Sequence, residues 1–499
     1  MRIKSFFQFS IILFLFFSCN TDKKNTIVKP NVLVLMSDNH YFEHLGCYGD
    51  NMVKTPTIDK IAKQGVRFTN AYCASPSCTP ARAAMLTGQE IWRLNEGANL
   101  WSTLSVTIPT YQDILEEAGY FTGHDRKGWG PGNYKVGGRD KNPAGATFIN
   151  FTEFLDKNVE NKPWSFFFSS KKPHRPFEYG AAQKAGLNID SVIVPPYLPD
   201  SYEVRSDICD YYNEIMNFDN QVAEALLIIK KRGMLANTII IVCADNGWMM
   251  PRGLANLYDF GTRVPLIISW PKNIPENRVV TDFVSLNDLS PTILEYAGEK
   301  IPAVMTAKSL KNLLTKEEQG RIEPKRNKVF MARERHALVR KGGLGYPGRA
   351  IRTDNFLFIH NYEPERWPAG DPPLFGDIDL HMLQSYSPAK EYMMEHRNNP
   401  EVKPLFEQAF LKRPKEELFD LKNDPFQMNN VADLDEYQDI KKQLILQLKE
   451  YLVLTGDPRE TDKKIIWDTS KYFMEDDWIG KPSKEAQEKF GLEETYSYK

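Results

Sequence analysis

The sequence is poor in cysteine and has no long apolar run beyond its N-terminus. Six cysteines occur among 499 residues, without the density of a disulfide framework or the spacing of a zinc site. The longest later apolar run, residues 238–244, has the length of a buried strand and is too short to span a membrane. The formal net charge of -2 gives no basic field for nucleic acid. What is left is a globular chain that is long enough for two domains.

The N-terminus differs from the rest of the chain. Arg2 and Lys4 precede the apolar run 11–17, and Ser18 and Cys19 follow it. This order is typical of a secretory signal, and a small residue directly before Cys19 resembles the lipobox of bacterial lipoproteins. We expect a signal peptide at 1–18, lipidation of Cys19 and a polar tether at 19–28. The protein would then be exported and held by its lipid on the outer membrane, facing the periplasm or the cell surface. The alternative is ordinary signal cleavage near Ser18.

The pattern of apolar segments predicts an α/β fold. Continuous apolar strands are expected at 31–37, 164–169, 238–244 and 266–270, and helical spacing separates them. Continuous apolarity favours strands buried on both faces, as in a mostly parallel sheet between helices. We therefore predict a large domain with a mixed, mostly parallel sheet.

The character of the chain changes after about residue 325. Short strands are expected at 328–332, 350–353 and 355–360, and one amphipathic helix at 440–451. This pattern favours a smaller α+β domain with a short antiparallel sheet. The predicted boundaries are 29–325 for the large domain, 326–460 for the small domain and 461–499 for a polar, wrapping tail.

Two acidic clusters follow predicted strands. Asp38-Asn39 ends the first strand, and Asp245-Asn246 ends the strand 238–244. Open α/β sheets bind ligands outside the carboxyl ends of their strands. Oxygen ligands of this kind suit a hard divalent cation, Ca²⁺ or Mg²⁺, although an Asp after a strand is most often a turn residue or a helix cap.

The most specific motif is Cys78-Thr79-Pro80-Ala81-Arg82, followed by Leu86-Thr87-Gly88. It resembles the signature of the formylglycine-dependent sulfatase family, which belongs to the alkaline-phosphatase superfamily. Further segments are similar to that family, among them 127–130, 172–176, 257–265, 288–292 and 417–425. Within the family, the sequences of these segments most resemble N-sulfoglucosamine sulfohydrolase and bacterial polysaccharide sulfatases. The resemblance covers most of the mature chain and implies an alkaline-phosphatase-like fold.

The resemblance also implies roles for individual residues. A separate formylglycine-generating or anaerobic sulfatase-maturating enzyme would oxidise Cys78 to formylglycine, whose hydrate is the nucleophile. Arg82 would fix that group, Lys127 would bind a sulfate oxygen, and His174 would contact sulfate or protonate the leaving group. The cation would be held by five residues, namely Asp38, Asn39, Cys78, Asp245 and Asn246.

The sequence departs from the family pattern at three positions. Asn39 stands where many members carry a second Asp, which lowers the ligand charge by one. Leu254 stands where a cationic residue is expected, and nearby Arg252 is the candidate to replace it. Trp129 stands where a second His is expected, and His40, His124 and His336 are possible replacements. We therefore expect Arg252, His336 and Trp129 to contact substrate.

The predicted reaction is hydrolysis of a sulfate ester, or of a sulfamate, on a sulfated polysaccharide or its oligosaccharides. Ulvan-like and heparan-like chains are the two substrate classes to test first. Arginines, histidines and aromatic residues in 333–336 and 360–367 suit either an anionic sugar chain or a domain interface. Two alternatives stay open: a phosphoesterase of the same superfamily, and a glycan-binding lipoprotein whose catalytic site has decayed.

Overall fold

The computed structural model of the protein describes residues 29–379, 387–461 and 463–473, together with residues 484 and 488. An eight-stranded sheet has the order β4-β3-β5-β1-β6-β7-β2-β8, and a four-stranded sheet has the order β12-β11-β10-β9. This arrangement confirms the predicted fold class of a large, mostly parallel sheet with a smaller antiparallel sheet.

The larger sheet is parallel except at β7, which runs antiparallel to both of its neighbours. Its strands are β1 (Asn31–Ser37), β2 (Val66–Tyr72), β3 (Phe121–Asp125), β4 (Ala146–Phe148), β5 (Trp164–Ser169), β6 (Thr238–Ala244), β7 (Leu266–Ser269) and β8 (Arg278–Ser285). Every residue of β1, β5 and β6 is buried, as their continuous apolar sequences predict.

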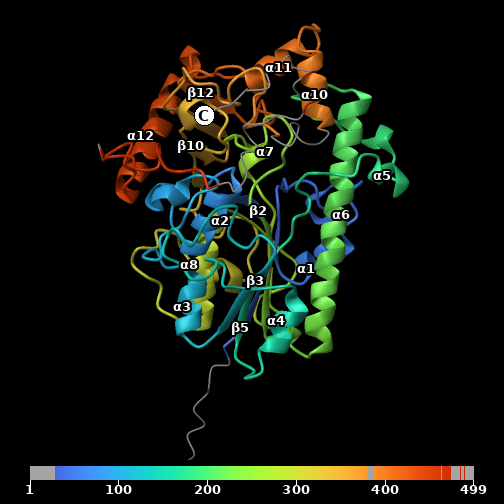
Figure 1. Ribbon diagram of the computed structural model, residues 1–499, viewed down its shortest axis with the longest axis vertical. Helices are drawn as coiled ribbons and strands as arrows, with labels where there is room; N and C mark the ends of the chain where they lie inside the picture. The colour runs from blue at the N-terminus through green and yellow to red at the C-terminus, as the bar shows by residue number, and fades with distance from the viewer. Residues whose placement is uncertain (1–28, 380–386, 462, 474–483, 485–487, 489–499) are drawn as a thin grey trace, which may run out of the picture.

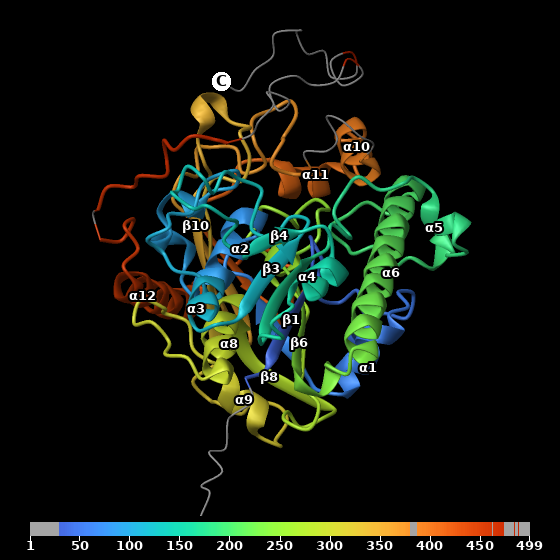
Figure 2. The ribbon, with the colours of Figure 1, turned by 60° about the horizontal axis from the view of Figure 1, so that its bottom comes forward.

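Helices cover both faces of this sheet. Figure 1 shows α6 (Tyr202–Lys231) along one face with α1 (Pro56–Lys63) and α4 (Phe151–Lys157). The opposite face carries α2 (Cys78–Thr87), α3 (Tyr111–Glu117) and α8 (Leu289–Ala297), and Figure 2 shows the same division from another side. The remaining helices of the first part are short, namely α5 (Ala181–Lys184), α7 (Asp259–Thr262) and α9 (Lys311–Thr315).

The smaller sheet lies near one end of the larger one (Figure 1). Its antiparallel strands are β9 (Lys328–Arg333), β10 (Gly348–Thr353), β11 (Phe356–Asn361) and β12 (Glu416–Asp420). Three helices accompany it, namely α10 (Pro388–Glu395), α11 (Lys403–Phe410) and α12 (Gln438–Thr455). The backbone N–H of Ala332 in β9 donates to the carbonyl of Ala74, so the two parts are joined beside the segment that leads into α2.

Among the described residues, no helix combines the length and the apolarity needed to cross a membrane. The five cysteines of that part, Cys47, Cys73, Cys78, Cys209 and Cys243, form no disulfide. The predicted signal peptide, the lipidation site Cys19 and the whole of the tether lie outside the described residues.

Candidate active site

Four neighbouring strands bring the predicted site residues together. In the order β3-β5-β1-β6, Lys127 follows β3, His174 follows β5, Asp38 follows β1 and Asp245 follows β6. Because these strands are parallel, their carboxyl ends meet at one edge of the sheet. A cavity of about 410 Å³ lies there, and Asp38, Asn39, Cys78, Lys127 and His174 are among its lining residues.

The two acidic clusters are adjacent because their strands pair in register. Ser37 of β1 lies opposite Ala244 of β6, so the next residues, Asp38 and Asp245, leave the sheet side by side. The backbone N–H of Asn39 donates to Asp245 Oδ1 at 3.0 Å. Asn39 has a φ of 63°, a left-handed conformation that Asn adopts more readily than most residues.

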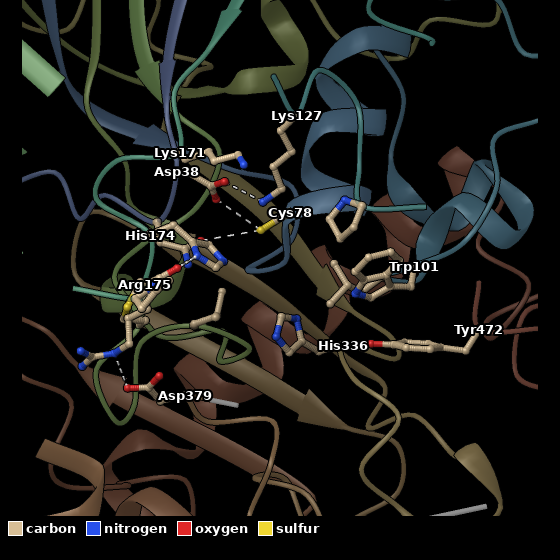
Figure 3. A pocket seen from close by; sticks show the side chains of 16 residues that line it. Asp38, Cys78, Trp101, Lys127, Lys171, His174, Arg175, His336, Asp379 and Tyr472 are labelled. Carbon is tan, nitrogen blue, oxygen red and sulfur yellow. Dashed lines mark hydrogen bonds and ion pairs between the residues drawn. The ribbon is translucent and has the colours of Figure 1, made fainter. Parts of the chain in front are cut away.

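Cys78 is the first residue of α2 and points at both clusters. Its Sγ lies 3.5 Å from Asp38 Oδ1, 3.7 Å from Asn39 Oδ1 and 3.7 Å from Asn246 Nδ2. Figure 3 shows the sulfur between Lys127 and His174 in this view of the cavity. Burial and the neighbouring Asp38 raise the pKa of the Cys78 thiol well above its usual range. The unmodified side chain is therefore a neutral thiol at physiological pH, and a neutral thiol is a weak nucleophile.

Arg82 lies one turn after Cys78 on the same helix and is completely buried. Its Nε donates to Asp245 Oδ2 at 2.8 Å, and its terminal nitrogen Nη1 donates to the carbonyl of Gly128 at 2.7 Å and to Ser169 Oγ at 2.5 Å. Ion pairs with neighbouring carboxylates outweigh the effect of burial and raise the pKa of Arg82. A permanent positive charge is therefore fixed beneath Cys78, tied to the ends of three strands.

Lys127 supplies a second positive charge. Its Nζ lies 2.6 Å from Asp38 Oδ2. Burial alone would raise the pKa of Asp38, but Lys127 and Arg82 outweigh it, so the pKa is lowered. For Asp245, burial and the charge of Asp38 prevail, and its pKa is raised. Lys127 and Arg82 offset the repulsion between the two buried carboxylates, and a bound cation would offset it further.

The cluster has the donor set of a cation site. Asp38, Cys78 and Asp245 each offer one ligand atom, and these atoms lie within 4.8 Å of one another. The buried oxygen Asn246 Oδ1 has no hydrogen-bond partner among the described residues. An unpaired buried amide oxygen beside two carboxylates fits a hard cation such as Ca²⁺ or Mg²⁺, because such cations prefer oxygen ligands.

His174 reaches the cavity from the loop after β5. Its Nδ1 lies 2.6 Å from the carbonyl oxygen of Arg175. A carbonyl only accepts, so Nδ1 carries the hydrogen of the neutral ring, and Nε2 carries the lone pair. Burial and the positive charge of Lys127 lower the pKa of His174 to about 4.

Several lining residues could not be anticipated from local sequence. Trp101 and Tyr472 line the cavity together, with ring centroids 6.3 Å apart. The backbone N–H of Phe473 donates to the carbonyl of Trp101 at 2.7 Å, which ties the C-terminal segment to this wall. Other lining residues that the motifs did not indicate are Leu100, Pro131, Lys171, Met249 and Asp379, and Arg175 and Pro176 of the segment 172–176 line the cavity as well. Arg175 is occupied by buried ion pairs with Asp207 and Asp379.

Two predicted substrate contacts are not supported by the structure. Arg252 has a φ of 72°, and its terminal nitrogens donate to Gln408 Oε1 and to the carbonyl of Gln427 in the C-terminal part. Its side chain therefore joins the two parts and does not replace a cation at Leu254, which itself lines the cavity. Trp129 is 2% exposed and packs in the core, so its indole is a structural residue.

The candidate histidines differ in whether they line the cavity. His336 lines the cavity. His40 bonds to Ser37 and to the carbonyl of His44, and His124 bonds to Thr147 and to the carbonyl of Asp125; neither is among the lining residues of this cavity. The arginines of β10 are held in ion pairs, those of Arg349 within the C-terminal part and that of Arg352 with the larger part. Arg349 pairs with Glu334 and Asp457, and Arg352 pairs with Asp259.

Comparisons with known proteins agree with this geometry. An ulvan-active sulfatase of Formosa agariphila is 28% identical over 86% of this chain and 76% of its own. Human N-sulphoglucosamine sulphohydrolase is 25% identical over 86% of this chain and 91% of its own.

Solved structures share the fold. The structure of BT4656 with its substrate D-glucosamine-2-N,6-O-disulfate has a TM-score of 0.63 at 19% identity and covers 87% of this chain and 100% of its own. A phosphonate monoester hydrolase of Silicibacter pomeroyi has a TM-score of 0.59 at 15% identity and covers 86% and 96%. The fold by itself therefore does not separate sulfate from phosphonate chemistry.

The family matches make that distinction. Residues 246–371 match the family described as N-sulphoglucosamine sulphohydrolase, C-terminal, and residues 30–299 match the Sulfatase family. The second match spans more than half of the 499 residues and contains Cys78, both acidic clusters, Lys127 and His174. The chain belongs to the sulfatase family and is a sulfuric ester hydrolase.

Proposed function

We propose that the protein removes sulfate from a sulfated polysaccharide or its oligosaccharides, with formylglycine made from Cys78 and with a divalent cation. The observation that carries the proposal is the position of Cys78. Its side chain opens on a cavity between two acidic clusters, and Arg82 is fixed one helical turn away. The unmodified thiol is held neutral in this cluster and is therefore a weak nucleophile, which supports its conversion to formylglycine.

Formylglycine at position 78 would supply a geminal diol, in which one hydroxyl attacks sulfur and the second allows the later release of sulfate. The surrounding residues prepare that position. Arg82 holds Asp245 and the loop at Gly128 in place, so its charge is part of a rigid frame. In this proposal a separate maturating enzyme oxidises Cys78, as the family resemblance implies.

Asp38, Asn39, Asp245 and Asn246 would hold the cation. A bound Ca²⁺ or Mg²⁺ would polarise sulfate oxygens and favour the ionised form of the nucleophile. The protein supplies two carboxylates and two amide oxygens. The second carboxylate of many relatives is replaced by Asn39, so we expect a site of lower charge and weaker affinity.

Lys127 and His174 would handle the sulfate group. Lys127 already bridges toward Cys78 through Asp38, and its ammonium group would bind a non-bridging sulfate oxygen. His174 is neutral and presents a lone pair at Nε2. It would accept a hydrogen bond, or a proton, from a hydroxyl group near sulfur.

The rest of the cavity suits a sugar with acidic groups. Trp101 and Tyr472 offer ring faces, and Lys171 adds a cationic group on the lining. Aromatic rings stack on sugar faces, and lysine binds sulfate or carboxylate. The relatives named above act on ulvan or carry the name of a sulfamate hydrolase. We therefore propose ulvan-like or heparan-like chains, with an O-sulfate or an N-sulfate as the group removed.

We also propose export and lipid anchoring, on the pattern of residues 1–19. A polymer too large to enter the cell has to be degraded outside the cytoplasm, so this location suits the substrate. Radiolabelled palmitate should be incorporated into the wild-type protein and not into a Cys19→Ala variant. Incorporation that is equal in both would contradict the anchor.

The central experiment uses protein expressed with a maturating enzyme. Mass spectrometry should find the Cys78 peptide as an aldehyde, and incubation with defined sulfated oligosaccharides should release sulfate from one position. The Cys78→Ala variant should keep its melting temperature and lose turnover. Phosphate and phosphonate esters are the comparison substrates. A faster rate on those esters, or substantial turnover by Cys78→Ala, would contradict the proposal.

A further inference from the structure

Ser77 does not cap the helix that it precedes. It stands at the N-cap of α2, where a serine side chain usually accepts a hydrogen bond from the first turn, yet its Oγ makes no such bond. Its Oγ lies instead 2.8 Å from Nδ1 of His336. Ser77 is 2% exposed and His336 is 6% exposed. Ser77, directly before Cys78, is thus hydrogen-bonded to a histidine from the C-terminal part of the chain.

The direction of this hydrogen bond follows from counting donors. Ser77 Oγ has no other partner among the described residues. If Nδ1 donated, the serine hydroxyl hydrogen would be buried with nothing to accept it, which native structures avoid. The hydroxyl therefore donates to Nδ1. In a neutral ring the hydrogen then lies on Nε2, and the pKa of His336, lowered by burial to about 4, keeps the ring neutral.

The Nε2–H of His336 is directed to the cavity. No described residue forms a hydrogen bond with this atom, and the atom is not completely buried. His336 lines the cavity with Leu254, Trp101 and Tyr472, and Figure 3 shows its ring between Tyr472 and Arg175, on the side of the cavity away from Lys127. A buried ring with one fixed donor thus faces the space that a substrate would fill.

The Nε2 atoms of His336 and His174 differ in hydrogen-bonding character: one is a donor and the other an acceptor. His174 uses its Nδ1–H on the carbonyl of Arg175 and has its lone pair on Nε2, whereas His336 has its hydrogen on Nε2. Stabilising negative charge requires a donor. In their neutral forms, only the second of these two rings offers one.

We propose that His336 donates a hydrogen bond from Nε2 to the bridging oxygen that joins sulfate to the sugar, and that Ser77 positions it for this role. The inference rests on the proposed sulfatase function. As the S–O bond breaks, its electron pair stays on that oxygen, and the Nε2–H stabilises the charge as it forms; the proton that completes the alcohol comes from water. Leu254 and Trp129 occupy the positions at which the family resemblance led us to expect a cation and a histidine.

The test compares leaving groups of different acidity. Wild-type enzyme, His336→Ala, His336→Gln, Ser77→Ala and the exposed-site control His396→Ala are matured, and their formylglycine contents are measured by mass spectrometry. Values of kcat/KM per formylglycine are then obtained for a sulfated oligosaccharide and for a series of aryl sulfates. An alcohol is a poor leaving group and needs the donor, whereas 4-nitrophenolate needs it little.

We expect His336→Ala to lose about 100-fold or more on the saccharide and less than about tenfold on 4-nitrophenyl sulfate, so that rate depends more steeply on leaving-group acidity. His336→Gln, which keeps an N–H donor, should recover part of the loss, and Ser77→Ala should show a smaller loss of the same pattern. Equal losses on all substrates, or none, would overturn the role of His336. A wild-type enzyme that desulfates neither substrate class would instead contradict the proposed function itself.

Discussion

Lys127 Nζ lies 2.6 Å from Asp38 Oδ2, and this contact links the loops that follow β3 and β1. The pair is part of a cluster in which two carboxylates, Asp38 and Asp245, face two cations, Lys127 and Arg82. Arg82 is held by hydrogen bonds from Nε and Nη1 to Asp245, Gly128 and Ser169, while Lys127 extends from a loop toward the cavity. Lys127 is therefore the cation that can move from Asp38 to a bound sulfate.

Replacing Lys127 tests that role. Lys127→Met should lower kcat/KM on sulfated substrate by about 10²–10³-fold, as expected for loss of a charged contact to the reacting group. Inorganic sulfate should also inhibit the variant less strongly than it inhibits the wild type. Lys184→Met is a suitable control, because Lys184 forms only an exposed pair with Glu178. A variant at position 127 with the sulfate inhibition of wild type would exclude the contact.

Asn39→Asp tests the cation site. The change replaces the amide, whose Oδ1 lies 3.7 Å from the Cys78 sulfur, by a carboxylate beside Asp38 and Asp245. Without a cation the three carboxylates should repel one another and lower the melting temperature. With Ca²⁺ the added charge should tighten binding. Titration calorimetry should give a lower Kd for Ca²⁺, and calcium should raise the melting temperature more than in wild type.

The surface variant Asn273→Asp controls for the general effect of one added charge. Asn273 is exposed and lies in a turn after β7. If Asn39→Asp and Asn273→Asp respond to calcium alike, Asn39 is not a ligand. Chelation of wild-type enzyme should likewise remove activity, and added Ca²⁺ or Mg²⁺ should restore it, with the more effective ion identifying the resident one.

Much of this site could be predicted from sequence because its elements are local. The continuous apolar runs 164–169 and 238–244 coincide with β5 and β6. Asp38 and Asp245 follow two such strands, and the Cys78 motif fixes the start of α2 together with Arg82 at helical spacing. The α/β class and the meeting of these residues follow from the rule that parallel strands end at one edge.

The features that the sequence did not predict have physical causes that a linear pattern does not contain. Arg252 is two residues from Leu254, but its left-handed backbone directs the side chain to Gln408 and Gln427. The strand β8 contains Thr281 and Asp282 and so lacks the continuous apolarity that identified the buried strands, and the sequence pattern did not predict it. Trp101 and Tyr472 are far apart in the chain, and only tertiary folding brings them together.

Tyr472 provides a prediction about substrate size. It lies in the C-terminal segment, where Arg335 donates to the carbonyl of Ser470 at 2.9 Å and stands 5.5 Å from the Tyr472 ring. Tyr472→Ala should remove one aromatic wall of the cavity and raise KM for a sulfated oligosaccharide about tenfold. Turnover of 4-nitrophenyl sulfate should change little, because no sugar has to be held.

Trp101→Ala should give the same pattern, since the two rings form one wall. Tyr202→Ala is the matched control, because the side chain of Tyr202 is 55% exposed at the start of α6. If the oligosaccharide KM is unchanged in both cavity variants, the sugar does not lie against this wall, and the segment that ends at Phe473 serves stability alone.

Lys390 makes stability depend on pH. It is fully buried in α10, and its Nζ donates to the carbonyls of Phe375 and Ile378. Burial lowers its pKa to about 7, against the opposing influence of Asp379, Asp377 and Glu391. In the unfolded chain a lysine has a pKa of about 10.4. Between these values the unfolded state binds more protons, so the free energy of unfolding rises with pH.

The contribution of Lys390 to the pH dependence can be measured by comparing the free energy of unfolding of wild type with that of a Lys390→Met variant. Each pH unit in this window contributes at most about 1.4 kcal/mol, so between pH 7.5 and 9 the free energy of unfolding of wild type should rise by about 2 kcal/mol relative to Lys390→Met. Urea unfolding of both proteins at the two pH values gives this difference, in which the other titrating groups cancel. Lys403→Met, at an exposed position of α11, should show no such change. A constant difference between wild type and Lys390→Met would mean that Lys390 stays protonated in the folded protein across this range, so that its two carbonyl contacts and the nearby carboxylates outweigh the effect of burial.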